Sequence, residues 1–285
     1  MAIGWYPGHM HKARKDITSA LQQVDAVLEL VDARLPYSSE NPLLNKLIGN
    51  IFRIRVLNKN DLADPAVTAL WQKHYQDAGI PCLLLEKDDP SAVKRLLKEI
   101  TRNLEPRSSR ANRILIAGIP NVGKSTLINL LAERKIAKVG DEPAVTKARQ
   151  EIKLTEDLML LDTPGILWPK IEDQQSAYRL AATGAIRNTA FELGDVGLFV
   201  VELLQERYPS ALRKRYEIQT EGREPLALLE EIGKKRGCLT KSGIDFTKAG
   251  EVVLNDLRTG KLGLVSLETP ADIPPPATES SADES

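Results

Sequence analysis

The residues with the clearest chemical signature lie near the middle of the chain, at Gly118–Ser125. Their sequence, Gly-Ile-Pro-Asn-Val-Gly-Lys-Ser, fits the pattern G-x-x-x-x-G-K-[S/T] of a phosphate-binding loop. In this pattern backbone N–H groups surround the phosphates, the lysine reaches the terminal phosphates, and the final hydroxyl binds Mg²⁺. The spacing therefore predicts a nucleotide site that contains Asn121, Val122, Gly123, Lys124, Ser125 and Thr126.

A second acidic group for the metal follows the apolar run Leu158–Leu161. Asp162 begins the pattern D-x-x-G, which ends at Gly165, so we expect Asp162 near Mg²⁺ and the Gly165 N–H near a γ-phosphate. Between the two motifs, Thr146 is the best candidate for a switch residue that ligates the metal while the γ-phosphate is present. Lys124 and Thr146 are the catalytic candidates in this half. The simpler alternatives are that Asp162–Gly165 is only a turn at the end of a strand and that Thr146 is an ordinary surface threonine.

The base is selected by a different stretch, Asn58-Lys59-Asn60-Asp61, which matches N-K-x-D and follows the apolar run Phe52–Leu57. A carboxylate at Asp61 accepts hydrogen bonds from guanine N1–H and the 2-amino group. Adenine offers neither donor, so the pattern favours GTP and GDP over ATP. The predicted base-binding residues are Asn58, Lys59 and Asp61.

The order of the two motifs is reversed. In ordinary GTPases the phosphate loop precedes N-K-x-D, whereas here Asn58 precedes Gly118. The order predicts a circular permutation, with the base-recognition half first and the phosphate and switch half second. We expect the two motifs at adjacent strand ends, and we expect the segment after Asp162 to connect the nucleotide to the part of the chain that follows.

The elements that must position these motifs are read from apolar runs. Asp64 and Ser91 are expected to cap helices, and Gly79 to end the first of them. Alternation of strands and helices predicts an α/β fold with a doubly wound, mostly parallel sheet. The expected strands are 26–31, 52–57, 81–85, 114–117, 151–154 and 158–161.

After about Lys170 the apolar residues recur at helical spacing, which predicts a second, all-helical domain. The expected division is residues 1–172 for the permuted GTPase domain with an N-terminal basic helix, 173–267 for an RNA-binding helical domain, and 268–285 for a disordered acidic tail.

Composition limits the class of protein. The formal net charge is zero, so bulk charge does not indicate a nucleic-acid partner, and an RNA would have to meet local basic patches. No apolar run approaches membrane-spanning length, and no signal peptide is evident. Cys82 and Cys238 suggest neither a disulfide nor a zinc site. The simplest expectation is a cytoplasmic protein without a membrane partner.

Together with the permuted motif order, three further stretches carry a family resemblance: Trp5–Met10, Asp32-Ala33-Arg34 and Asp256–Gly263. With them the chain resembles the YlqF-type circularly permuted GTPases over residues 1 to about 269. The resemblance implies a role for the protein in late assembly of the large (50S) ribosomal subunit, in which the helical domain binds rRNA. It also implies a K⁺ ion near the phosphates, held by Asn121, and His9 as the residue that positions the attacking water.

One departure from general GTPases concerns that water. Ile166 follows Gly165, where many GTPases carry a glutamine that orients the nucleophile, and an aliphatic side chain cannot do so. His9 is equally compatible with RNA contact or simple exposure. Basic runs at Lys12–Lys15 and Lys234–Arg236 fit either rRNA or solvent.

The leading hypothesis is a GTP-hydrolysing switch with Mg²⁺ and K⁺. The alternative is an RNA-binding scaffold that holds GTP with little turnover, which Ile166 favours. An ATP-dependent, kinase-like enzyme is a third possibility, and Asp61 argues against it.

Overall fold

A six-stranded sheet organises the first half of the protein. The computed structural model describes residues 17–86, 89–105, 107, 109–132, 150–162, 171 and 173–275. In this part of the chain the strand order is β3–β2–β1–β4–β6–β5, and every pairing is parallel except that of β5 with β6. The strands are β1 (Ala26–Asp32), β2 (Phe52–Asn58), β3 (Cys82–Leu84), β4 (Asn112–Gly118), β5 (Gln150–Lys153) and β6 (Leu158–Asp162). The predicted doubly wound, mostly parallel α/β sheet is confirmed.

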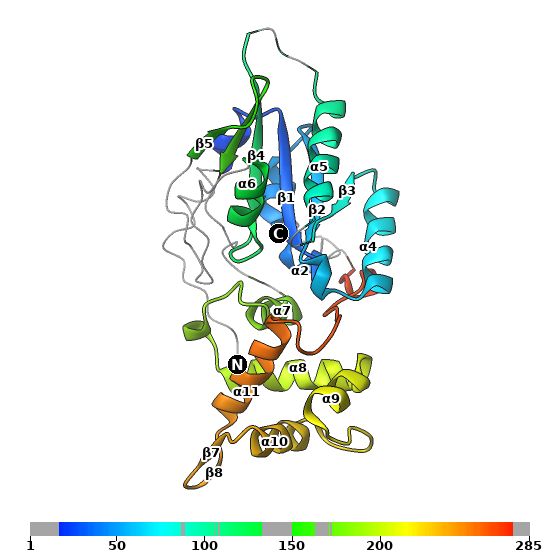
Figure 1. The fold of residues 1–285 in the computed structure, drawn as a ribbon, viewed down its shortest axis with the longest axis vertical. Helices are drawn as coiled ribbons and strands as arrows, with labels where there is room; N and C mark the ends of the chain where they lie inside the picture. The colour runs from blue at the N-terminus through cyan, green and yellow to red at the C-terminus, as the bar shows by residue number, and fades with distance from the viewer. Residues whose placement is uncertain are drawn as a thin grey trace, which may run out of the picture.

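Helices cover both faces of this sheet (Figure 1). Successive side chains of a strand point to opposite faces. Accordingly Leu28 and Leu30 belong to the apolar cluster that contains α5 and α6, whereas Val27 packs with α3 and Val31 with α4. The helices are α2 (Pro36–Ser39), α3 (Pro42–Leu47), α4 (Pro65–Asp77), α5 (Pro90–Asn103) and α6 (Lys124–Leu131).

The helix starts show one success and one error of the sequence prediction. Asp64 caps α4 as expected, since its carboxylate accepts from the N–H groups of Ala66 and Val67. Ser91 does not cap α5. Asp89 does, accepting from Ser91 N at 2.8 Å, because Pro90 occupies the first helical position and needs no partner for a missing N–H.

The second half of the described chain is mainly helical (Figure 1). It departs from the expected all-helical domain in one short antiparallel hairpin near residue 240. Its longest pair, α8 and α11, crosses closely at Gly197 and Gly250, where a Cβ on Gly197 would lie 2.4 Å from the Gly250 Cα. The elements are α7 (Gln174–Ala182), the 3₁₀ turn η3 (Asn188–Ala190), α8 (Leu193–Arg207), α9 (Pro209–Tyr216), α10 (Pro225–Lys235), a short hairpin of β7 (Leu239–Thr240) and β8 (Gly243–Ile244), and α11 (Phe246–Arg258).

After α11 the chain returns to the sheet half as a segment without regular structure except the 3₁₀ turn η4 (Pro270–Asp272). We call residues 259–273 the strap. It runs from α11 to α4, where η4 packs (Figure 1). The strap includes residues 268–273, which the sequence analysis assigned to the acidic tail. Among the described residues, no helix is both long and apolar enough to cross a membrane.

Candidate functional site

The phosphate loop connects β4 to α6 and passes very close to its neighbours. A Cβ on Gly118 would lie 2.7 Å from the Leu30 carbonyl oxygen, and one on Gly123 would lie 2.2 Å from Asn58 Nδ2. Gly123 also has a φ of +101° and is the N-cap residue of α6. Both positions therefore require glycine. The N–H groups of the first turn of α6 begin at this loop, which suits a bound phosphate.

Lys124 is buried at the base of this loop. Its Nζ donates to the carbonyl oxygens of Gly118 at 3.0 Å and Ile119 at 2.9 Å. Burial lowers the pKa of Lys124 to about 8, against the opposing effect of the negative charge of Asp162. The ammonium is thus held on backbone carbonyls in a poorly solvated place, where a phosphate would be a stronger partner.

The groups expected to hold Mg²⁺ lie at the same edge of the sheet. Asp162 ends β6 and is 1 % exposed, and β6 pairs with β4 so that Asp162 is opposite Ile116. Ser125 is half-buried in the first turn of α6. A buried carboxylate and a hydroxyl at one edge of a sheet fit Mg²⁺, which takes oxygen ligands and usually needs few from the protein when phosphates supply others. The described residues contain no cluster of three or more His, Cys, Asp or Glu side chains that would suggest a different metal.

The N-K-x-D residues follow β2 directly. Asn58 is the last residue of the strand, Lys59 adopts a left-handed conformation with φ 59°, and Asn60–Leu62 form the 3₁₀ turn η2. Asn58 Nδ2 donates to the Val122 carbonyl oxygen at 2.6 Å, which joins this turn to the phosphate loop. Asp61 is exposed, so a nucleotide base can reach its carboxylate.

The expectation that the two motifs end adjacent strands is wrong. β1 lies between β2 and β4, and its last residue, Asp32, is opposite Asn58 in the register. The physical reason is that β2 and β4 each pair with β1, so the apolar runs alone did not indicate which strand takes the centre. Asn58 spans the gap through the side-chain bond to Val122.

Asp32 is 1 % exposed and is the charged centre of this intervening strand end. Its carboxylate accepts hydrogen bonds from Arg34 Nε at 2.9 Å and Nη2 at 2.8 Å, and it forms an ion pair with Lys59 Nζ at 3.1 Å. Burial raises the pKa of Asp32, but the charges of Arg34 and Lys59 outweigh it and hold the pKa well below its usual range. Burial lowers the pKa of Lys59, and the Asp32 charge opposes that shift. The sequence analysis quoted Asp32 and Arg34 without a role, although a charged residue directly after an apolar strand, as at Asp162, was the available signal.

Asn121, the candidate K⁺ ligand, has a φ of 58° in the phosphate loop. Its Nδ2 donates to the Gly184 carbonyl oxygen at 2.8 Å, just after α7. The phosphate loop is therefore in direct contact with the helical half. A side-chain carbonyl oxygen is a donor type that suits a hard cation, so Asn121 fits the expected role by its chemistry.

Several expected site residues lie outside the described part of the chain: His9, Thr146, Gly165 and Ile166, and with them the basic run Lys12–Lys15. Of the others, the structure brings Asn58, Asn121, Val122, Gly123, Lys124, Ser125 and Asp162 to the carboxyl edge of one sheet, with Lys59, Asp61 and Thr126 beside them. Ligands of open α/β sheets bind at this edge. The arrangement is suited to a nucleotide with its base at η2 and its phosphates at the start of α6.

Comparisons with known proteins show a GTPase family. Residues 113–235 match the family model described as 50S ribosome-binding GTPase, and residues 40–172 match RsgA GTPase. The chain is 48 % identical to Ribosome biogenesis GTPase A of Bacillus licheniformis over 96 % of this chain and 100 % of the relative. It is 33 % identical to the protein of the same name from Thermotoga maritima over 96 % and 97 %.

Solved structures of YlqF have a similar fold. A GNP-bound structure of YlqF from Thermotoga maritima matches with a TM-score of 0.65 and 30 % identity, over 92 % of this chain and 100 % of that one. A GDP-bound YlqF structure matches with the same TM-score at 29 % identity, over 90 % and 100 %.

Proposed function

The chain belongs to the ribosome biogenesis GTPase A family of GTP-hydrolysing enzymes that act in ribosome biogenesis, and from this premise we propose that it is a switch on the large subunit. In this proposal it binds the assembling 50S particle in the GTP state, acts in late maturation, and is released by hydrolysis. The observation that carries the nucleotide part is the 2.6 Å bond between Asn58 Nδ2 and Val122 O, since it holds the base and phosphate ends in one unit.

At the phosphates, Lys124 exchanges its two backbone carbonyls for phosphate oxygens when the nucleotide binds. Ser125 and Asp162 would hold Mg²⁺, which would neutralise charge on the phosphates, and Thr146 would be a further ligand in the GTP state. The N–H groups of Gly165 and of the first turn of α6 hold the phosphate oxygens. Asn121 is proposed to hold K⁺.

At the base, Asp61 accepts from guanine N1–H and the 2-amino group, and Asn58 and Lys59 keep the turn in place. The attacking water is the remaining requirement. Ile166 cannot accept its proton, so we assign the positioning of the water to His9, whose neutral imidazole can accept a hydrogen bond near pH 7.

We assign rRNA contact to the basic C-terminal ends of α9 and α10, where Arg213, Lys234 and Arg236 are exposed. The two ends are joined because Arg236 Nη2 donates to the Arg215 carbonyl oxygen at 2.9 Å. The Arg236 guanidinium carbon also lies 5.3 Å from the centroid of the Tyr216 ring, a cation–π contact. Arg213 and Lys234 also pair with acidic neighbours, so the surface is mixed rather than strongly basic. Such contacts would position the protein on the particle.

The test is co-sedimentation of the protein with 30S and 50S particles in GDP or a non-hydrolysable GTP analogue. We expect 50S binding with the analogue, weaker binding with GDP, and none to 30S. Asp61→Asn should transfer this dependence from guanine to xanthine nucleotides, because a carboxamide can donate to the added xanthine carbonyl. Particle binding that ignores the nucleotide, with no turnover on 50S, would favour the scaffold alternative instead.

A further inference from the structure

Two stretches singled out in the sequence, Asp32-Ala33-Arg34 and Asp256–Gly263, have no role assigned in nucleotide binding so far. In the structure they meet beside the guanine loop, residues 58–62. They come from opposite ends of the described chain, since Arg34 and Leu257 are 223 residues apart. Their meeting point connects the helical half to base recognition.

Arg34 is the centre of the connection. Two of its guanidinium nitrogens hold Asp32, which in turn pairs with Lys59 of the guanine loop. The third, Nη1, donates to the Leu257 carbonyl oxygen in the last turn of α11 at 3.2 Å. The Arg34 carbonyl oxygen accepts from Leu267 N of the strap at 2.7 Å. Arg34 is 1 % exposed, so all these contacts are shielded from water.

The strap also contacts the guanine loop directly. Val265 N donates to the Leu62 carbonyl oxygen at 3.1 Å. Gly260, with a φ of +74°, lies so near Leu62 that an added Cβ would be 2.8 Å from its Cδ2. Just beyond the loop, Asp64 N donates to Ser266 Oγ at 3.2 Å. The C-terminal end of the loop is thus supported by residues that follow α11.

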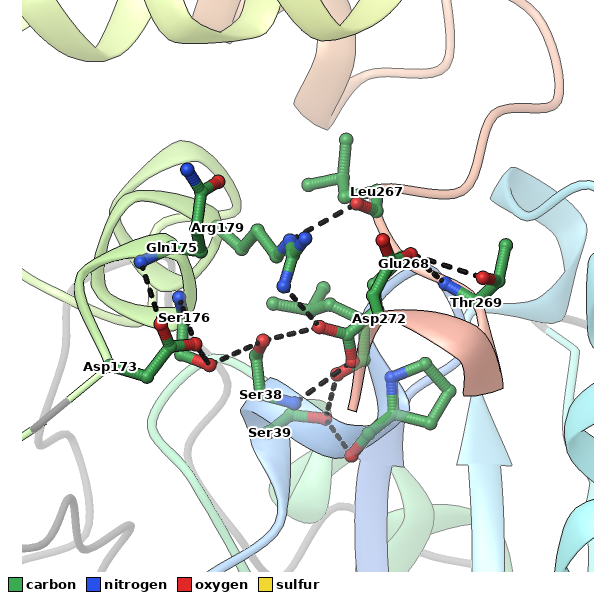
Figure 2. Close-up of polar contacts among 12 residues, drawn as sticks. Ser38, Ser39, Asp173, Gln175, Ser176, Arg179, Leu267, Glu268, Thr269 and Asp272 are labelled. Atoms are coloured by element: carbon green, nitrogen blue, oxygen red, sulfur yellow. Dashed lines mark hydrogen bonds and ion pairs between the residues drawn. The ribbon is translucent and has the colours of Figure 1, made fainter. Parts of the chain in front are cut away.

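The strap is fixed at its far end by Glu268, which is fully buried (Figure 2). Its carboxylate accepts from Ser38 N at 2.9 Å, from the Ser38 hydroxyl, and from Arg179 Nη1 at 3.2 Å. Trp71 Nε1 of α4 donates to the Glu268 carbonyl oxygen at 3.3 Å. The strap therefore has one end on α11 and the other on α2, α4 and α7, with the guanine loop between them.

We propose that Arg34 and the strap are positioning elements for guanine recognition, so that base selectivity depends on where α11 is held. Asp61 can accept two hydrogen bonds from guanine only if its turn is fixed, and Lys59 holds that turn in a left-handed conformation that needs support. A partner that moves α11 therefore changes the affinity for guanine nucleotides. The inference rests on the proposed assignment of Asn58–Asp61 to the base.

The experiment measures the dissociation constants of GDP and IDP, which lacks the 2-amino group, by fluorescence titration. Arg34→Gln removes the guanidinium and leaves Asp32 paired with Lys59. Arg110→Gln is the control, because Arg110 also holds an aspartate, Asp25, with two nitrogens at 2.7 and 3.0 Å, but does so at the start of β1, away from α11, the strap and the guanine loop. Thermal midpoints are measured for each variant.

We expect Arg34→Gln to lower GDP affinity about tenfold and to reduce the preference for GDP over IDP about fivefold. Arg110→Gln should keep both within about twofold, whatever its loss of thermal midpoint. Ser266→Ala, a milder change in the strap, should reduce the preference about twofold and serves if Arg34→Gln does not fold.

The two proposals fail differently. If Asp61→Asn loses the preference for GDP over IDP while Arg34→Gln and Ser266→Ala both keep it, the strap does not position the loop and the base assignment stands. If Asp61→Asn keeps the preference too, the base assignment itself is wrong. Equal losses in Arg34→Gln and Arg110→Gln would show a general stability effect and overturn the positioning role.

Discussion

Replacing Glu268 by glutamine should make the stability of the protein less sensitive to pH. Burial raises the pKa of Glu268 from 4.5 to about 7, although Ser38 and Arg179 favour the charged form. Because the folded state holds this proton more tightly than the unfolded state, the stability it contributes is complete below pH 4.5 and lost as pH rises to about 7. The shift from 4.5 to about 7 corresponds to about 3 kcal/mol.

Glutamine has no proton to lose in this range and keeps the shape of the side chain. Between pH 5 and pH 8 the original protein should therefore lose about 2.5 kcal/mol of unfolding free energy that Glu268→Gln does not lose. Urea unfolding followed by tryptophan fluorescence measures this, since Trp71 is bonded to the Glu268 carbonyl and senses the strap.

The control is Asp272→Asn on the same strap. Arg207 and the Thr269 N–H lower the pKa of Asp272 to about 2 despite its partial burial, so its contribution is present above pH 3.8 and lost only as pH falls further. Between pH 5 and pH 8 the profile of Asp272→Asn should run parallel to that of the original protein. A parallel profile for Glu268→Gln as well would refute the reasoning, because Glu268 would then titrate alike in the folded and unfolded states.

Three further outcomes are expected. Asn58→Ala should weaken GDP binding at least about tenfold, because the buried Val122 carbonyl loses its 2.6 Å partner, and Lys73→Ala on the exposed face of α4 should leave a GDP titration unchanged. Single-turnover hydrolysis should be faster in K⁺ than in Na⁺ at matched ionic strength, and equal rates would remove the K⁺ role of Asn121. His9→Ala should bind GTP normally and lose about 10²–10⁴-fold of the 50S-stimulated rate; full stimulated turnover would show that His9 is not catalytic, and loss of 50S binding would indicate RNA contact.

The sequence predicted those parts of the fold that depend on local signals. β1, β2, β4 and β6 are apolar runs, and the chemical groups of the phosphate loop and N-K-x-D stand at their ends, so strand ends and motifs could be placed together. The central position of β1 could not be placed, because pairing order depends on contacts between distant segments. The cap of α5 was assigned to Ser91 because the preference of Pro90 for the first helical position was not weighed against the aspartate before it.

The strap was beyond prediction for a different reason. Its residues show neither helical nor strand periodicity, and a glutamate is expected on the surface, yet Glu268 is fully buried. Hydrogen bonds from Ser38, which is 230 residues earlier in the chain, and from Arg179 compensate for the burial of its carboxylate. Likewise the acceptor of Asn58 is a backbone carbonyl in another motif, which no spacing rule indicates.

The sequence distance across the strap has a consequence during synthesis. Arg34 leaves the ribosome 223 residues before Leu257 does, which at about 5–20 residues per second is roughly 10–45 s. Contacts of such high sequence separation also form slowly, since a long loop must be closed first. In a nascent chain the guanine loop and the phosphate loop both emerge well before the residues that support them. With the strap in its proposed positioning role, firm guanine-nucleotide binding by a growing chain has to wait until residues 257–268 have been synthesised and have closed this long loop.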